Sequence, residues 1–166
     1  MTAINMPTIN IKHKGIFDLA DIQQGIKKYF EDDYFKVHYP KHKIKQPAGG
    51  WEHEITIYGE RKMNDYVKFT IKLFIRLYDI KDIEIVKEGK KIKTNSGRIT
   101  VDISGVIDLD FENRFGGSKF LQALQNFYHK YVIKQDIGDV WEDDIMIKMV
   151  NLGKLIREKC QQDILT

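Results

Sequence analysis

The chain has 166 residues, of which 42% are hydrophobic and 31% are charged, with a formal net charge of +3. These values exclude an intrinsically disordered chain and are typical of one globular domain, so we expect a single domain over residues 1–166. No apolar run approaches the roughly 20 residues that span a bilayer, and the first residues lack the features of a secretory signal. The single cysteine, Cys160, cannot form an internal disulfide, which favours a reducing, cytoplasmic location.

The first elements in chain order are a short strand and a helix. Ile9 and Ile11 alternate with polar residues, which predicts a strand over residues 8–13 that ends at Gly15. Asp18 is the expected N-cap of a helix, because apolar residues at helical spacing follow it.

Two further strands and a loop are expected next. Residues 34–39 predict a strand that Pro40 ends, and the proline and glycines within residues 41–50 predict a loop. From Trp51 the chain alternates again and predicts a strand. The residues expected on its apolar face are Trp51, His53, Ile55 and Ile57.

The clearest pattern in the sequence is the strict alternation over residues 66–78. It predicts one long strand with one buried face and one face in water. The residues expected to be buried are Val67, Phe69, Ile71, Leu73, Ile75 and Leu77. The residues expected to face outward are Tyr66, Lys68, Thr70, Lys72, Phe74, Arg76 and Tyr78.

A hairpin and another long strand follow. Residues 83–87 and 91–93 predict a short hairpin, and Asn95-Ser96-Gly97 predicts a turn into a strand over residues 98–110. Gly105 interrupts the inner face of that strand, which indicates a bend or a close crossing by another element.

Two helices end the chain. Ser118 is the expected N-cap of the first, whose apolar positions are Phe120, Leu121, Leu124, Phe127 and Tyr131. Asp139 is the expected N-cap of the second and longer helix. Its apolar stripe comprises Trp141, Ile145, Met149, Leu152, Ile156 and Cys160.

These elements predict an α+β fold, in which a curved antiparallel sheet is packed on one face by helices, including the long C-terminal helix. A long sheet curls because its strands twist, and a curled sheet closed by a helix tends to enclose a cavity. The candidates for lining such a cavity are Trp51, His53, Phe69, Gly105, Trp141 and Met149.

This element order resembles the helix-grip arrangement of START-type lipid-transfer domains and the polyketide-cyclase-like superfamily. Ile9 and Ile11 would lie in the first strand, and residues 141–160 would form the gripped helix. The chain departs from that pattern in the extra helix over residues 118–133, and in one clear helix after the first strand where the family usually has two. The resemblance implies an apolar small-molecule ligand, a cyclisation activity or a protein partner, since the superfamily includes all three.

Candidates for catalysis and metal binding are few. His53 on an apolar strand face is the one candidate for acid–base chemistry, although a hydrogen-bonded structural histidine is the commoner reading. His38 and His42 flank Pro40, which excludes the helical spacing of a zinc site, so we expect neither a metal nor a cofactor. The carboxylates at outer strand positions, Asp102, Asp108, Asp110 and Glu112, are expected to pair with cations across strands.

Candidates for an interaction surface are the aromatic residues that interrupt the outer strand face, Tyr66, Phe74 and Tyr78, together with Lys90 and Lys91 at the hairpin. They favour a protein partner or self-association. Nucleic acid is disfavoured as a partner, because 22 lysines stand against 5 arginines.

Three functions therefore stay open. The first is a non-enzymatic binding or protein-interaction module, which acts through a cavity or through the outer sheet face. The second is a small-molecule enzyme of cyclase or hydrolase type that uses His53. The third is a structural or assembly subunit that self-associates through Tyr66, Phe74 and Tyr78.

Overall fold

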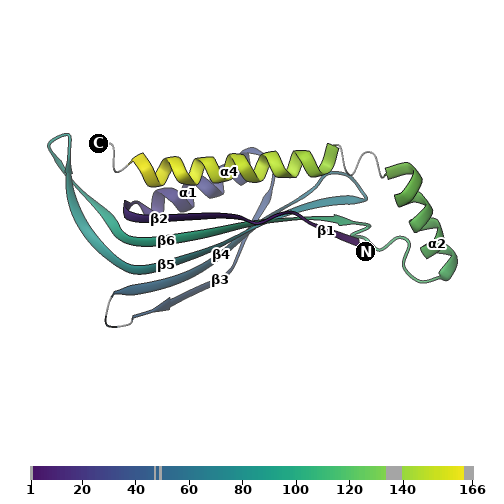
Figure 1. Cartoon of the computed structure of the whole chain (residues 1–166), viewed down its shortest axis with the longest axis horizontal. Helices are drawn as coiled ribbons and strands as arrows, with labels where there is room; N and C mark the ends of the chain where they lie inside the picture. Colours follow the sequence, from purple (N-terminus) through teal and green to yellow (C-terminus); the bar gives the residue numbers. More distant parts are fainter. Residues whose placement is uncertain (1, 47, 49, 134–139, 163–166) are drawn as a thin grey trace.

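A long antiparallel sheet with helices on one face forms the body of the protein. The computed structural model describes every residue except 1, 47, 49, 134–139 and 163–166 (Figure 1). The sheet is six-stranded, in the order β1-β6-β5-β4-β3, and β2 pairs with β6 beside β1. The predicted α+β fold with an antiparallel sheet is confirmed.

The elements have the following bounds. The strands are β1 (Thr2–Asn5), β2 (Ile9–Phe17), β3 (Lys36–Lys45), β4 (Trp51–Lys62), β5 (Val67–Lys87) and β6 (Lys90–Leu109). The helices are α1 (Leu19–Asp32), α2 (Lys119–Tyr128), the π-helical turn η1 (His129–Ile133) and α4 (Glu142–Gln162).

The alternation in β5 divides the sheet into a covered face and an open face. The six residues predicted to be buried, from Val67 to Leu77, are at most 2% exposed. Lys68 and Arg76 are half-buried and Lys72 is exposed, so the predicted register of this strand is confirmed. Since directly paired residues in neighbouring strands share a face, this register assigns the outward residues of the whole sheet.

Two predictions about the hairpin of β5 and β6 are wrong. One is that the strand over residues 66–78 ends before a separate short hairpin, and the other is that Asn95-Ser96-Gly97 forms a turn. The ladder between these strands runs without a turn from Val67↔Leu109 to Lys87↔Lys90, so Asn95-Ser96-Gly97 lies within β6. A register shift between Tyr78 and Lys81 takes up the irregularity of this region. The predicted short hairpin is therefore only the tip of a long one, which curls past the end of the helices (Figure 1).

The predicted loop over residues 41–50 is also wrong over its first half. β3 continues through Pro40 to Lys45, with a register shift between His38 and Lys41. Proline has no backbone N–H to donate to a neighbouring strand. It is tolerated here because β3 is an edge strand and Pro40 lies at the register shift, where regular pairing is interrupted.

The N-terminal edge of the sheet is longer than the sequence predicted. β2 continues past Gly15 to Phe17, and Gly15 pairs with Gly97 of β6. The sequence pattern did not identify β1, which pairs with the last four residues of β6. Together β1 and β2 protect one edge of β6 along most of its length.

The helices α1 and α4 lie side by side on the covered face (Figure 1). The predicted N-cap Asp18 accepts a hydrogen bond from the Asp21 N–H at 3.1 Å, which begins α1. The predicted stripe of α4 is fully buried from Ile145 to Ile156, whereas its expected cap Asp139 lies outside the described residues.

Gly105 lies where α4 crosses β6, as the sequence indicated. A Cβ atom at this glycine would stand 2.5 Å from Met149 Sδ and 3.2 Å from Ile145 Cδ1. The absence of a side chain therefore allows the helix to approach the strand closely.

α2 does not join this packing. Ser118 accepts a hydrogen bond from the Leu121 N–H at 3.1 Å, so the predicted cap is confirmed. However, none of the residues in α2 is buried, and the helix projects at one end of the molecule (Figure 1).

Candidate functional site

The open face of the sheet carries most of its polar chemistry in rows that cross the strands. One row runs from Asn10 through Asp102, Phe74 and Thr56 to Lys41. The next runs from Lys12 through Thr100, Arg76 and Glu54 to Lys43. Among the described residues no helix covers this face. We use the name open face for the side of the sheet that these rows define.

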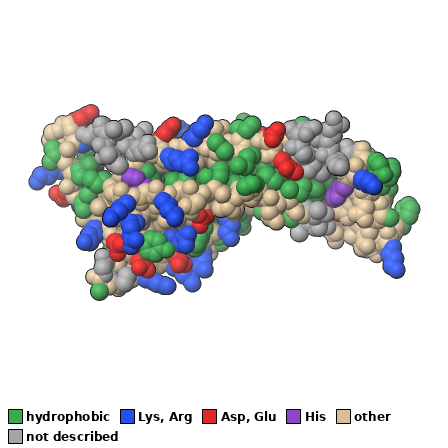
Figure 2. Space-filling model, in the orientation of Figure 1, with side chains coloured by type: hydrophobic (Ala, Val, Ile, Leu, Met, Phe, Trp, Pro, Cys, Tyr) green, Lys and Arg blue, Asp and Glu red, His purple; other side chains and the backbone are tan. Residues whose placement is uncertain are grey.

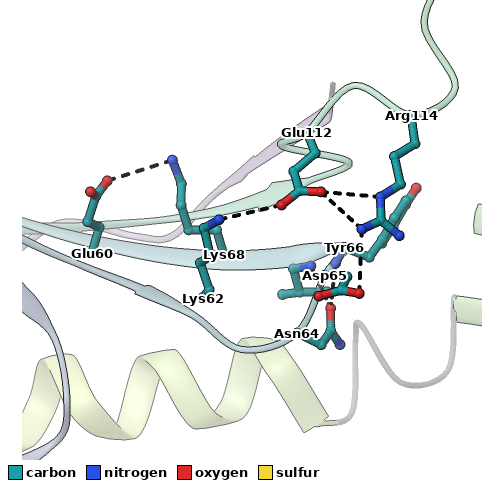
Figure 3. Close-up of polar contacts among 9 residues, drawn as sticks. Glu60, Lys62, Asn64, Asp65, Tyr66, Lys68, Glu112 and Arg114 are labelled. Atoms are coloured by element: carbon teal, nitrogen blue, oxygen red, sulfur yellow. Dashed lines mark hydrogen bonds and ion pairs between the residues drawn. The ribbon is translucent and has the colours of Figure 1, made fainter.

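Ion pairs neutralise the open face near the turn between β4 and β5 (Figure 3). Lys68 Nζ lies 3.8 Å from Glu60 Oε2 and 3.6 Å from Asp108 Oδ2. Glu112 lies 3.4 Å from Lys62 Nζ and 3.0 Å from the Arg114 guanidinium. The hydrogen bond from Arg114 lowers the pKa of the Glu112 carboxyl. The cations at this end of the face thus have acidic partners.

The acidic strand residues pair as the sequence predicted, with one exception. Asp102 receives a hydrogen bond from Arg76 at 3.0 Å, and Asp108 faces Lys68. Asp110 instead turns inward and is 1% exposed. Its carboxylate accepts hydrogen bonds from the Arg114 and Phe115 N–H groups, so it orders the loop after β6.

Lysines without an acidic partner occupy the rest of the open face. None of them forms an ion pair within the part of the chain that the structure describes, and all of them are exposed. They come from β2, from the whole length of β3 and from the middle of β5. They are Lys12, Lys14, Lys36, Lys41, Lys43, Lys45 and Lys72. Figure 2 shows lysine and arginine side chains gathered over the region where these strands lie.

A groove of about 680 Å³ lies at the centre of this lysine cluster. Phe74 lines it, and Lys41 and Lys72 contribute cations from β3 and β5. The remaining lining residues are Thr8, Pro40, Thr56, Asp102 and Ser104. The Arg76 guanidinium stands 5.5 Å from the centre of the Phe74 ring and also pairs with Asp102, so the acidic residue in the groove already has a partner.

A second groove, of about 440 Å³, repeats the same combination further along β5. It is lined by Tyr78 and by two unpaired lysines, Lys12 and Lys14. Arg98 stands 5.5 Å from the Tyr78 ring and pairs with Asp79 at 2.7 Å. Phe74 and Tyr78 are four residues apart on one strand, which corresponds to about 13 Å.

The aromatic residues predicted to form an interaction surface lie in two different environments. Phe74 and Tyr78 are half-buried on the open face, each beside an arginine. Tyr66 is instead covered by the loop before α2 and by the end of that helix, since its ring makes edge contacts with Phe115, Tyr128 and His129. A further pair was missed: the rings of His38 and Tyr58 stack at 4.7 Å on the open face.

The structure brings His53 within hydrogen-bond distance of another histidine. Its Nδ1 atom lies 3.4 Å from His42 Nε2 near the start of β4, where the side chain is half-buried. Burial lowers the pKa of His53 and the neighbouring His42 lowers it further, whereas the Asp82 carboxylate acts on it through its charge and opposes this lowering. Trp51 lies beyond a register shift and is 45% exposed.

The other cavity candidates lie in the packed interface between the sheet and α4. Phe69 and Met149 are fully buried, and Trp141 packs edge-on against Phe69 at 5.8 Å. Met149, Ile145 and Met6 fill the space over Gly105. Lys90 and Lys91 lie at the hairpin tip, away from these groups, and are exposed.

The described residues contain no group of three or more histidine, cysteine or acidic side chains that could hold a metal ion. Within the same residues, no helix has the length and apolarity that crossing a membrane requires. No protein-family model and no curated protein matches this sequence.

Sequence reasoning missed Lys41, Lys43 and Lys45 of β3 because it assigned them to a loop. A signal was present, since Lys41, Lys43 and Lys45 alternate with His42 and Ile44 at the period of a strand. The proline and glycines around this segment outweighed that alternation.

Proposed function

We propose that this protein is a non-enzymatic binding module that holds single-stranded nucleic acid on the open face of its sheet. The observation that carries the proposal is the set of exposed, unpaired lysines around two grooves, each of which contains an aromatic ring. Lysines attract the phosphates, and aromatic rings stack on the bases of a strand that has no pairing partner.

The distribution of charge on the open face favours nucleic acid as the ligand, whereas the overall composition of the chain disfavoured it. A net charge of +3 and a low arginine content disfavoured nucleic acid. On the open face, however, the acidic residues Glu60, Asp102 and Asp108 are already paired with cations. Glu54 and Glu52 lie directly across the ladder from Lys43 and Lys45, so they partly offset the charge of these two lysines. The remaining field is positive and concentrated on one side of the molecule.

The aromatic rings favour a nucleic acid over an acidic protein segment. An acidic peptide would use the lysines but would gain little from Phe74 and Tyr78. A polymer that alternates anions with flat rings uses both, and two aromatic residues about 13 Å apart along one strand, each in a groove with lysines, suit a repeating ligand.

The helix-grip resemblance remains a proposal based on element order. The position of α4 across the curled sheet supports it, whereas the filled space at Gly105 argues against that point of the interface as the ligand site. An outward-facing ligand site is therefore the reading that we favour.

Fluorescence anisotropy with a labelled single-stranded oligonucleotide of mixed sequence tests the proposal. An unlabelled duplex of the same sequence and unlabelled polyglutamate serve as competitors. Lys41→Glu/Lys72→Glu should weaken binding by at least about tenfold. It should also reduce the slope of log affinity against log salt by about 1.4, because each lost phosphate contact contributes about 0.7 for a single strand.

Lys28→Glu/Lys154→Glu is the matched control. It makes the same charge change at exposed positions on α1 and α4, away from the open face, and should leave affinity within about twofold. Phe74→Ala should weaken binding without changing the salt slope, since it removes a stacking surface and no charge. Equal losses in both charge-reversal pairs, or binding to polyglutamate in preference to the oligonucleotide, would overturn the proposal.

A further inference from the structure

The helix α2 is attached to the body of the protein by its polar side. Gln125 Nε2 donates a hydrogen bond to the buried Asp110 carboxylate at 3.3 Å. One turn further along, His129 Nε2 contacts the Tyr66 hydroxyl. The positions Leu121, Gln125 and His129, which recur every four residues, are half-buried, so they form the side of the helix that faces the body.

The opposite side of the same helix carries a continuous apolar stripe. Its exposed fractions are 75% for Phe120, 43% for Leu124, 57% for Phe127 and 65% for Tyr131. The spacing of four and three residues aligns Phe120, Leu124 and Phe127 on one face of α2. Tyr131 continues the stripe in η1, where its ring centre lies 5.0 Å from that of Phe127. A helix at a protein surface ordinarily turns its apolar side inward, so this orientation is the reverse of the usual one.

The polar anchor fixes that orientation. Asp110 is 1% exposed and also accepts hydrogen bonds from the Arg114 and Phe115 N–H groups. Rotating α2 to bury its stripe would remove Gln125 from this carboxylate and would leave a buried charge with fewer donors. The fold therefore holds the apolar stripe in water.

The charges around the stripe indicate what covers it. Residues 113–133 contain no aspartate or glutamate, although charged residues make up 31% of the chain. The cations of this segment include Arg114 before α2, Lys119 at its start and Lys130 in η1. Lys119 adjoins Phe120 at the start of the stripe, and Lys130 Nζ stands 5.2 Å from the centre of the Tyr131 ring at its other end. Long lysine side chains in such positions reach the headgroups of a bilayer.

The size of the stripe argues against a second copy of this chain. A stable dimer buries about 800 Å² on each partner with about 20 to 30 residues. Three side chains on the 10-residue helix α2 and one on the 5-residue turn η1 supply only part of such a surface. A lipid surface needs no complementary groove, and it accepts a short helix with phenylalanine and tyrosine on one side and lysine beside them.

We propose that α2 docks this protein on an anionic lipid bilayer, with Phe120, Leu124, Phe127 and Tyr131 inserted among the headgroups and Lys119 and Lys130 contacting lipid phosphates. This inference does not depend on the proposed nucleic-acid face, which uses other residues.

Vesicle flotation of the full chain tests the proposal. The probes are vesicles of phosphatidylcholine, with and without phosphatidylserine. The protein should float with the anionic vesicles, and Phe120→Ser/Phe127→Ser should lose at least about tenfold in partitioning. Ile44→Ser/Val86→Ser removes two other exposed apolar side chains, which are 52% and 72% exposed, and should float as the wild type does.

Charge variants separate the helix from the lysine-rich open face. Lys119→Glu/Lys130→Glu should reduce flotation, whereas Lys41→Glu/Lys72→Glu should retain it. The reverse result would overturn the inference, because the membrane contact would then lie on the open face. Equal flotation with both lipid compositions would also overturn the inference, because it requires an anionic surface.

Sedimentation velocity tests whether a second copy of this chain, instead of a bilayer, covers the stripe. A wild-type dimer that Phe120→Ser/Phe127→Ser converts to a monomer, with no flotation of either protein, would assign the stripe to a second copy and overturn the lipid proposal. A monomer that floats only with anionic vesicles supports it.

Discussion

Gly105 of β6 lies directly beneath Met149 of α4, so close that a Cβ atom on the glycine would stand 2.5 Å from the Met149 sulfur. Gly105→Ala should therefore lower the free energy of unfolding by about 1–3 kcal/mol, because the methyl group has to displace the helix or the Met149 side chain. Chemical denaturation measures the change.

Gly153→Ala provides a control of opposite sign. A Cβ there meets its nearest atoms at 3.6 Å or more, and the residue lies within a helix, where alanine is favoured by up to about 1 kcal/mol over glycine. If Gly105→Ala is as well tolerated as Gly153→Ala, the close crossing of α4 over β6 is wrong.

Leu152 tests whether the stripe of α4 holds this helix on the sheet. The side chain is fully buried, so Leu152→Ala should cost roughly 2–5 kcal/mol of folding free energy. Ile147→Ala on the same helix truncates a residue that is 59% exposed and should stay within about 0.5 kcal/mol of the wild type. Similar melting temperatures for the two variants would contradict the packing of α4.

Tyr29 predicts a loss of stability at alkaline pH. Burial, followed by the charges of Asp33 and Asp144, raises the pKa of this phenol from 10.0 to about 12. The neutral ring donates a hydrogen bond to the Lys148 carbonyl at 2.9 Å. The folded state therefore favours the protonated phenol, and this contribution is complete below about pH 10 and is lost as pH rises through about 12.

Denaturation curves at increasing pH should consequently fall less steeply for Tyr29→Phe than for the wild type. Tyr34→Phe is the matched control, because that ring is 82% exposed. If the stability of Tyr29→Phe falls at alkaline pH as steeply as that of the wild type, other groups cause the loss.

His129 predicts that acid releases α2 from the body. Burial lowers the pKa of this imidazole from 6.5, and the nearby Asp110 carboxylate opposes the shift. The anchored state therefore favours the neutral ring, which can accept a hydrogen bond from the Tyr66 hydroxyl. This contribution is complete above about pH 6.5 and is lost as pH falls through the lowered pKa.

Hydrogen exchange of the α2 amides should thus be faster at about pH 5 than at about pH 7, after correction for the intrinsic rates. Tyr66→Phe removes the hydroxyl and should reduce protection at both values. An NMR titration that places His129 above its ordinary pKa would be incompatible with this account.

The sequence by itself determined the elements whose patterns are long and regular. Alternation over residues 66–78 gave the register of β5 because a slip by one residue would expose every apolar side chain. The stripe from Ile145 to Cys160 likewise defined the inner side of α4. Local capping chemistry identified Asp18 and Ser118, since each requires only a side chain and an N–H group three residues away.

Tertiary structure decided the features that depend on neighbours distant in sequence. A proline would interrupt a central strand, but Pro40 is accepted in β3 because β3 is an edge strand. Asn95-Ser96-Gly97 would form a turn in isolation, but pairing with β5 and β2 keeps it extended. The seven open-face lysines form one surface only because β2, β3 and β5 contribute to the same side of one sheet. The direction of α2 follows from Asp110, whose buried carboxylate 15 residues away binds the polar side of the helix, a contact that no local pattern records.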